Sequence, residues 1–200
     1  DHDQRALVDE AVARGVGELI MNVLKNDIRP SKIITRKSLE NAIAMVCASG
    51  GSTNGVLHLL AVAREAGVEL EIDDFETVSR RTPLLADLKP GGNYVATDLY
   101  AAGGVPLILK HLKDGGLLHE DEMTVTGETI GDEADKAVET PGQKVVLPAD
   151  APLKAQGGLA ILRGNLAPEG SVVKVAGTER RSHTGPARVY EREEDCFADV

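Results

Sequence analysis

The first two thirds of the chain carry the spacing of apolar residues that is typical of helices. Leu39, Ile43 and Val46 recur every three or four residues, which predicts a helix with one buried face. The same spacing returns after a short polar interruption, over residues 56–63. We therefore expect two consecutive helices, the second ending near Gly67, where glycine can close a helix.

Further helices are expected on either side of this pair. One spans about residues 4–26 and leads into a turn at 29–31. Thr35 stands where the helix containing Leu39 should begin, and its side chain is of a type that caps helices. A short helix begins around Asp73, and Thr82-Pro83 should end it because a residue before proline avoids the helical conformation.

The interruption between the two central helices is rich in glycine and small polar residues. It reads Ser49-Gly50-Gly51-Ser52-Thr53-Asn54. We expect Gly50 and Gly51 to take positive φ and end the first helix, and Ser52 to cap the next. The amides of a helix N-terminus could hold a carboxylate or phosphate of a ligand. A tight corner without a ligand is the alternative that local chemistry favours, because corners prefer these residue types.

The last third of the chain changes to short aliphatic runs separated by Pro, Gly and Asn, which is typical of strands and turns. The expected strands lie over 144–147, 158–163 and 171–175, and an earlier one over 84–88. The acidic segment 128–143 is interpreted as a connector. The pattern predicts an α/β class with a domain boundary near Asp150. Residues 1–150 would form the end of an α/β domain and 151–200 the start of a β-rich domain.

The charge balance narrows the choice of partners. The chain has 22 Lys and Arg against 32 Asp and Glu, for a net charge of -10. A nucleic-acid surface needs clustered cations, so no nucleic-acid partner is expected. The densest basic group, Arg180, Arg181, His183 and Arg188, is interpreted as a solvated loop. No apolar run approaches the length of about 18 residues that a membrane span needs, so we expect no membrane partner and a cytoplasmic or organelle-matrix location.

Side chains that could act alone are interpreted as structural. Cys47 and Cys196 lie far apart and belong to no CxxC pattern, so they form neither a zinc site nor a complete iron–sulfur site. Cys47 is expected to be a buried hydrophobe. His58 and Arg163 could contact a ligand, but ordinary surface or turn roles are favoured. The acidic runs 73–74, 120–122 and 191–195 are interpreted as solvated faces, so no metal site is expected.

Several segments together resemble the dihydroxy-acid and sugar-acid (phosphogluconate) dehydratase family, in its order and over roughly residues 28–190. They are Thr35 to Ile43, Gly50-Gly51-Ser52-Thr53-Asn54 with Leu57 to Ala61, Arg80 to Pro90, Ala102 to Pro106, Thr124 to Gly127 and Gly157 to Pro168. Within the family, Leu84 to Pro90 and Thr124 to Gly127 look closer to the dihydroxy-acid branch. The resemblance implies an α/β cofactor-binding domain followed by the first strands of a barrel-like β domain.

The resemblance implies a lyase that removes water from a 2,3-dihydroxy carboxylic acid and yields the 2-keto acid, a step of branched-chain amino-acid biosynthesis. Such chemistry needs a Lewis acid for the leaving hydroxyl, a base for the C2 proton and stabilisation of the enolate. In the family these roles are understood to fall to an iron–sulfur cluster, a magnesium ion and a serine. Their protein ligands and the serine are expected outside this segment, so the segment alone should be inactive.

The same resemblance implies where a contribution to the site would come from. Gly50, Gly51, Ser52, Thr53 and Asn54 are the candidate wall of a substrate or cofactor pocket, and neither a catalytic residue nor a metal ligand is expected in this chain. Because the chain starts with Asp1 within a helical pattern, we expect it to be a piece of a longer protein. Its expected partners are a small dihydroxy acid, the missing parts of the same chain and a second copy in a homodimer.

Two other functions stay open from the sequence. The first is a sugar-acid dehydratase acting on an aldonate or on 6-phosphogluconate, because substrate-choosing residues can lie outside the segment. The second is a noncatalytic module that binds an anion at Ser52 or mediates assembly. An enzyme segment should expose a large apolar surface where the rest of the chain packs, whereas an independent module should be monodisperse and fully folded.

Overall fold

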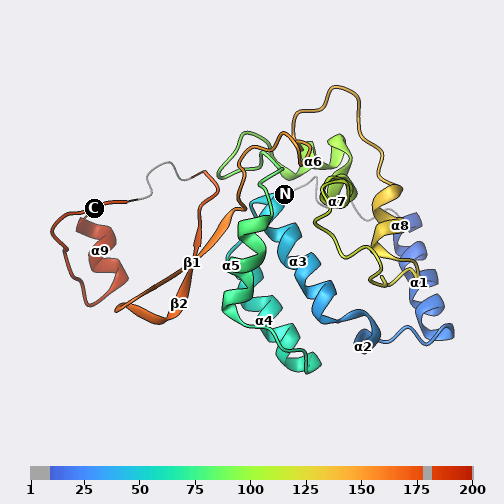
Figure 1. Cartoon of the computed structure of the whole chain (residues 1–200), viewed down its shortest axis with the longest axis horizontal. Coiled ribbons are helices and arrows are strands. Elements are labelled where there is room, and N and C mark those ends of the chain that lie inside the picture. Colours follow the sequence, from blue (N-terminus) through green and yellow to red (C-terminus); the bar gives the residue numbers. More distant parts are fainter. Residues whose placement is uncertain (1–9, 178–181, 200) are drawn as a thin grey trace.

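The computed structural model describes residues 10–177 and 182–199 and shows a helix-rich chain with a small sheet (Figure 1). The helices are α1 (Glu10–Lys25), α2 (Pro30–Ile33), α3 (Arg36–Ser49), α4 (Asn54–Ala66), α5 (Ile72–Arg81), α6 (Ala96–Ala102), α7 (Gly104–Asp114), α8 (Ile130–Asp135) and α9 (Glu193–Asp199). Strands β1 (Leu159–Gly164) and β2 (Ala167–Lys174) pair antiparallel. The expected mixed α/β class is confirmed.

The predicted ends of the central helices are confirmed by their capping geometry. The Thr35 hydroxyl accepts a hydrogen bond from the Ser38 amide at 3.0 Å, and the Ser38 hydroxyl accepts one from the Thr35 amide at 2.9 Å. This reciprocal pair satisfies two amides that the first turn leaves unbonded. Gly67 closes α4 with a φ of 68°, and Thr82 closes α5.

The core forms around α3, which packs against α4, α5 and α7. Its inward face repeats every four residues, and the fully buried side chains from neighbouring elements meet it there. They are Ile43 and Cys47 of α3, Phe75 of α5, Ile108 and Leu112 of α7, together with Leu85 and Val146 from extended segments. Leu159 of β1 is also buried and belongs to the same cluster. Residues on both sides of position 150 therefore share one core.

Four local predictions were wrong. The turn at 29–31 is instead the start of α2, with Pro30 in the first helical turn, where its missing N–H costs nothing. The run 84–88 pairs only through isolated bridges, one of which joins Ala86 to Val146, so neither 84–88 nor 144–147 forms a ladder strand. The connector 128–143 contains α8, whose N-cap Thr129 accepts from the Asp132 amide at 3.1 Å.

The other two predicted strands are confirmed as β1 and β2. Their register pairs Leu159 with Lys174 and Ile161 with Val172, and it becomes irregular between Leu162 and Gly164. β1 packs against α5, which ties the sheet to the helical core. In Figure 1 the sheet extends away from the helices towards α9, while α1 lies at the opposite edge.

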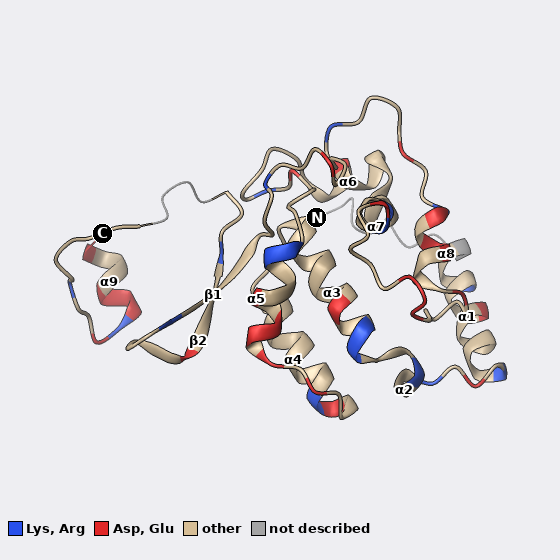
Figure 2. Cartoon of the chain, viewed as in Figure 1, with Lys and Arg blue, Asp and Glu red and all other residues tan. Residues whose placement is uncertain are grey.

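Lys and Arg are dispersed over several elements, whereas the charged side chains of α8 and α9 are all acidic (Figure 2). Of the predicted basic group, Arg180 and Arg181 lie outside the described residues. Arg188 is exposed and pairs with Asp199 at 2.5 Å. No helix in the described part of the chain is both long and apolar enough to span a bilayer. The predicted helix 4–26 is confirmed from residue 10 onward, since residues 4–9 are outside the description.

Candidate functional site

The joint between α3 and α4 is where the sequence placed the candidate pocket wall. Gly50 adopts a φ of 63° and ends α3, and the Gly51 amide donates to the Val46 carbonyl at 2.9 Å. Of the two glycines, only Gly50 has the predicted positive φ. It is also crowded, because a Cβ there would lie 3.1 Å from Leu84 and 3.3 Å from Ala176. Gly50 therefore serves both the left-handed cap and a close contact.

The start of α4 differs from the prediction by one residue. Thr53, not Ser52, directly precedes the helix, and no side-chain hydrogen bond from Thr53 caps it. The Ser52 hydroxyl accepts from the Asn54 amide at 3.1 Å, while the Ser52 and Thr53 carbonyls accept from the Gly55 and Val56 amides. Backbone and hydroxyl oxygens of the joint thus bond three of the amides that could have held a ligand. The Ser52 and Asn54 side chains are exposed.

The last carbonyls of α3 hold two distant segments of the chain. The Ala48 carbonyl accepts from the Leu85 amide at 2.8 Å and from the Ala86 amide at 3.0 Å. The Cys47 carbonyl accepts from the Gly158 amide at 3.1 Å. Helix ends leave carbonyls unbonded, and here they are satisfied by two segments that also carry the family resemblance. The end of α3 therefore holds two distant segments of the chain together by hydrogen bonds.

Gly157 and Gly158 allow the segment that contains them to approach the end of α3 closely. A Cβ on Gly157 would lie 2.7 Å from the Cβ of Cys47 and 2.9 Å from the hydroxyl of Ser79. A Cβ on Gly158 would lie 2.9 Å from the Cα of Gly50. These separations are shorter than side-chain carbons tolerate, so only glycine fits. The two glycines have a packing role that sequence analysis did not assign to them.

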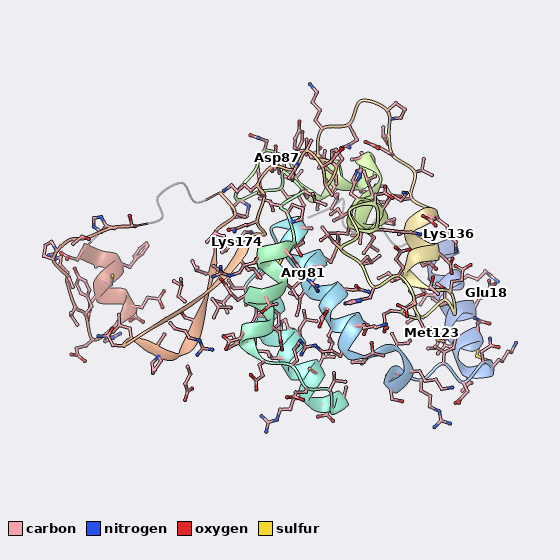
Figure 3. The ribbon with its side chains drawn as sticks, viewed as in Figure 1. Glu18, Arg81, Asp87, Met123, Lys136 and Lys174 are labelled. Carbon is pink, nitrogen blue, oxygen red and sulfur yellow. The ribbon has the colours of Figure 1, made fainter. Side chains whose placement is uncertain are left out.

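A cavity of about 110 Å³ opens beside Gly50. It is bounded by two backbone turns, 87–92 and 176–177, and carries one acidic and one basic side chain, Asp87 and Lys154. The Asp87 carboxylate accepts from the Asn93 amide at 3.2 Å and from its side-chain amide at 2.8 Å, which fixes the first turn. Figure 3 labels Asp87 in this loop. Of the five predicted wall residues, Gly50 is the one that lines this cavity.

Sequence analysis did not single out Asp87 or Lys154 as site residues. Asp87 lies within a segment that resembles the family, and the glycines at 91 and 92 after it could have signalled a turn that its carboxylate braces. Nothing near Lys154 in the sequence points to the cavity. The Lys154 ammonium donates to the Val175 carbonyl at 3.4 Å, a contact between residues 21 positions apart that only the fold creates.

A larger cavity, of about 710 Å³, lies between the end of α7 and the segment 148–155. Arg81, His111, Asp114 and Asp150 contribute its polar lining. The Nε2 atom of His111 is buried there and has no hydrogen-bond partner. Figure 3 labels Arg81 near the end of α5. This cavity is separate from the joint, so volume alone does not identify the predicted site.

Ionised side chains connect α3, α5 and the loop at His119. Glu40 accepts from Arg36 at 3.0 Å and from Arg81 at 3.1 Å, and it lies 2.8 Å from the Nε2 of His119. Burial raises the pKa of Glu40, but the hydrogen bonds from His119 and Arg36 outweigh it, so the pKa is lowered overall. Two hydrogen bonds from Arg36, at 2.6 and 2.8 Å, lower the pKa of Asp74. This network stabilises the helix packing.

The remaining candidates occupy structural positions. Arg163 pairs with Asp73 at 2.5 Å and donates to the Pro168 carbonyl at 3.2 Å, and His58 is exposed. Cys47 is fully buried, as predicted, and burial raises the pKa of its thiol to about 11. Cys196 lies on α9, far from Cys47 in the sequence.

The described residues do not fit a metal or cluster ligand set. Among residues 10–177 and 182–199, no three His, Cys, Asp or Glu side chains converge in a way that could hold a metal ion. The protonated, buried thiol of Cys47 is a poor ligand, because metals bind the thiolate. A complete ligand set for an iron–sulfur cluster or a magnesium ion would therefore need residues beyond the described ones.

Comparison with known proteins shows which family the chain belongs to. The dihydroxy-acid/6-phosphogluconate dehydratase N-terminal family model matches residues 5–133, and the C-terminal model of the same family matches residues 144–200. The chain belongs to the dihydroxy-acid/6-phosphogluconate dehydratase family. The resemblance noted in the sequence is thereby confirmed, while the proposed boundary near Asp150 stays a prediction.

Curated relatives narrow the comparison within the family. A dihydroxy-acid dehydratase of Koribacter versatilis is 59% identical over 191 residues, which cover 96% of this chain and 33% of the relative. Dihydroxy-acid dehydratases of Roseiflexus castenholzii and Thermus thermophilus are 58% and 52% identical, again over 96% of this chain and over 34% and 35% of their own lengths. The chain spans about a third of the curated relatives that it matches.

Proposed function

We propose that this chain is one third of a hydro-lyase that converts a 2,3-dihydroxy carboxylic acid to the 2-keto acid, in branched-chain amino-acid biosynthesis. The observation that carries the proposal is the 59% identity to a protein named dihydroxy-acid dehydratase, over nearly the whole chain. In the reaction the C3–OH bond breaks, the C2 proton leaves, and the resulting enol becomes the ketone. Acid–base groups and a Lewis acid assist such an elimination.

The part of this chain in that reaction is to support the site. The end of α3 holds the joint 50–54 and the turn at Asp87 against each other through the Ala48 carbonyl and the glycines at 157 and 158. The Ser52 and Thr53 hydroxyls and the Asn54 side-chain amide would form the wall, since three amides at the start of α4 are already bonded. An iron–sulfur cluster and magnesium would supply Lewis acidity from parts of the enzyme outside these residues.

The test is a chimera in which this chain replaces the matching third of the Koribacter versatilis dehydratase. Formation of 2-keto acid from a branched 2,3-dihydroxy acid is expected, with at most weak turnover of an aldonate or 6-phosphogluconate. Preference for a sugar acid would establish the alternative substrate class. A folded chimera with neither activity would contradict the proposal.

In an active chimera, Ser52→Ala with Thr53→Val should raise KM roughly 10-fold, as expected when hydroxyls that contact substrate are lost.

The noncatalytic alternative makes a different prediction for the chain alone. An independent module would be monodisperse and fully folded, and it would bind inorganic phosphate at the joint. An enzyme segment would bind a hydrophobic dye and show no phosphate affinity in titration calorimetry.

We further propose that the enzyme is a cytoplasmic or organelle-matrix homodimer without nucleic-acid or membrane partners, since the chain is acidic and its cations are dispersed.

A further inference from the structure

Helix α1 presents an apolar stripe that the described chain leaves uncovered. Val12, Val16, Ile20 and Leu24 follow one another at intervals of four residues and are 56%, 61%, 61% and 71% exposed. Residues four apart lie on one face of a helix, so these side chains form a continuous row. Glu18, labelled on α1 in Figure 3, lies about 160° around the helix from Ile20, on the polar side.

This exposure contrasts with the helices of the core. α3 buries Ile43 and Cys47 completely, whereas the described side chains of α1 reach at most the half-buried state, at Leu19 and Val23. A helix of 16 residues is marginal in water unless an apolar face packs against something. No described side chain of α1 is fully buried, so the described residues do not supply the packed face that this helix needs.

A second copy of this chain is a poor occupant for the stripe. Its side chains, with the adjacent Met21, offer roughly 500 Å² of exposed apolar surface, against about 800 Å² that each partner of a stable complex buries. The stripe is the right size for one element of the same polypeptide, which does not have to overcome the entropy of association.

We infer that the α1 stripe packs against another part of the parent dehydratase polypeptide. That part belongs to the roughly two thirds that the curated relatives possess and this chain does not match. This inference rests on the proposed function, because it assigns the uncovered face to the rest of the same enzyme. The occupant presents an apolar face that buries Ile20 and Leu24 and leaves Glu18 in solvent.

Ile20→Glu tests the inference in two settings, the chain alone and the active chimera with the Koribacter versatilis dehydratase. In the chain alone the substitution should change the melting temperature by less than about 2 °C, because Ile20 is exposed, and it should reduce binding of a hydrophobic dye. In the chimera it should lower the melting temperature by roughly 10 °C or more, or prevent soluble folding, because a carboxylate would be buried unpaired.

Two controls separate burial from loss of helix. Glu18→Gln, on the polar side of α1, should be tolerated in both settings, and Ile20→Met should keep the chimera folded because it retains an apolar side chain. Equal tolerance of Ile20→Glu and Glu18→Gln in an active chimera would overturn the inference. So would a dimer of the chain alone that Ile20→Glu dissociates, since the occupant would then be a second copy. An unmutated chimera that folds without activity would count against the proposed function instead.

Discussion

At the scale of single residues, burial decides which chemical groups can react. Cys47 is fully buried among α3, Ser79 and Gly157, and its pKa of about 11 keeps the thiol protonated at neutral pH. Cys196 is partly exposed on α9. Thiol reagents attack the thiolate, so the two cysteines should differ strongly in reactivity although both are free.

We expect a thiol-specific chromogenic reagent at pH 8 to label Cys196 rapidly and Cys47 only after unfolding in guanidinium. The reason is that burial both raises the pKa of Cys47 and blocks access to the reagent. Stopped-flow absorbance would give the two rates. Cys196→Ser should abolish the fast phase and leave the slow one. Two fast phases of equal size would contradict the buried position of Cys47.

At the scale of elements, α3 is organised by what its ends contact. Its N-terminus is capped by Thr35, and its C-terminal carbonyls bond segments near Leu85 and Gly158. Asn41 in its middle clamps the loop at His119, accepting from the His119 amide at 2.8 Å and donating to its carbonyl at 3.0 Å. The helix thereby joins residues that lie more than 100 positions apart.

Gly157→Ala tests the close contact between α3 and the start of β1. The added methyl would lie 2.7 Å from Cys47 and 2.9 Å from Ser79, so we expect a loss of roughly 1–3 kcal/mol in the free energy of unfolding. Gly164→Ala is the matched control, because a Cβ there meets no atom within 4 Å. Urea denaturation of both variants gives the comparison. Equal stability of the two would show that the chain does not pack as closely as described.

At the scale of the whole molecule, charged pairs link elements that the apolar core brings together. Arg36 of α3 pairs with Asp74 of α5, and Arg81 at the end of α5 returns to Glu40 of α3. The pKa values of Asp74 and Glu40 are lowered below their ordinary 3.8 and 4.5. The unfolded chain therefore binds more protons than the folded chain in this range, and stability rises with pH.

We expect the network's contribution to be complete above about pH 5 and to be lost as the pH falls through the lowered pKa values of both carboxylates. Arg36→Met should remove roughly 1 kcal/mol at pH 7 and less at pH 3, because protons bind to the carboxylates as the pH falls towards their lowered pKa values. Urea unfolding at the two pH values measures the difference. Arg29→Met is the control, because Arg29 pairs only with the exposed Asp27 among the described residues. A loss for Arg36→Met that is equal at both pH values would contradict the network.

Much of the local structure could be predicted from the sequence. Apolar spacing indicated α3, α4 and α5, and Thr35, Gly67 and Thr82 indicated where they begin or end, because caps depend on residues a few positions apart. The family was also recognisable from the ordered segments. The turn at 29–31 and the strand at 84–88 were wrong, and the start of α4 lies one residue later than predicted, although the Ser52 hydroxyl does accept from the Asn54 amide. The conformation of 84–88 depends on distant partners such as Val146.

The class of fold, the central helices, the burial of Cys47 and membership of the dehydratase family could all be predicted from the amino-acid sequence, because they depend on local periodicity and on motif order. The surroundings of these elements depend on how distant segments pack. The tertiary structure brought Asp87 and Lys154 to one cavity beside Gly50, required glycine at 157 and 158, and left the α1 stripe uncovered. The physical reason is that a close contact, a cavity or an exposed face is a relation between segments, and spacing along one segment carries no information about its partner.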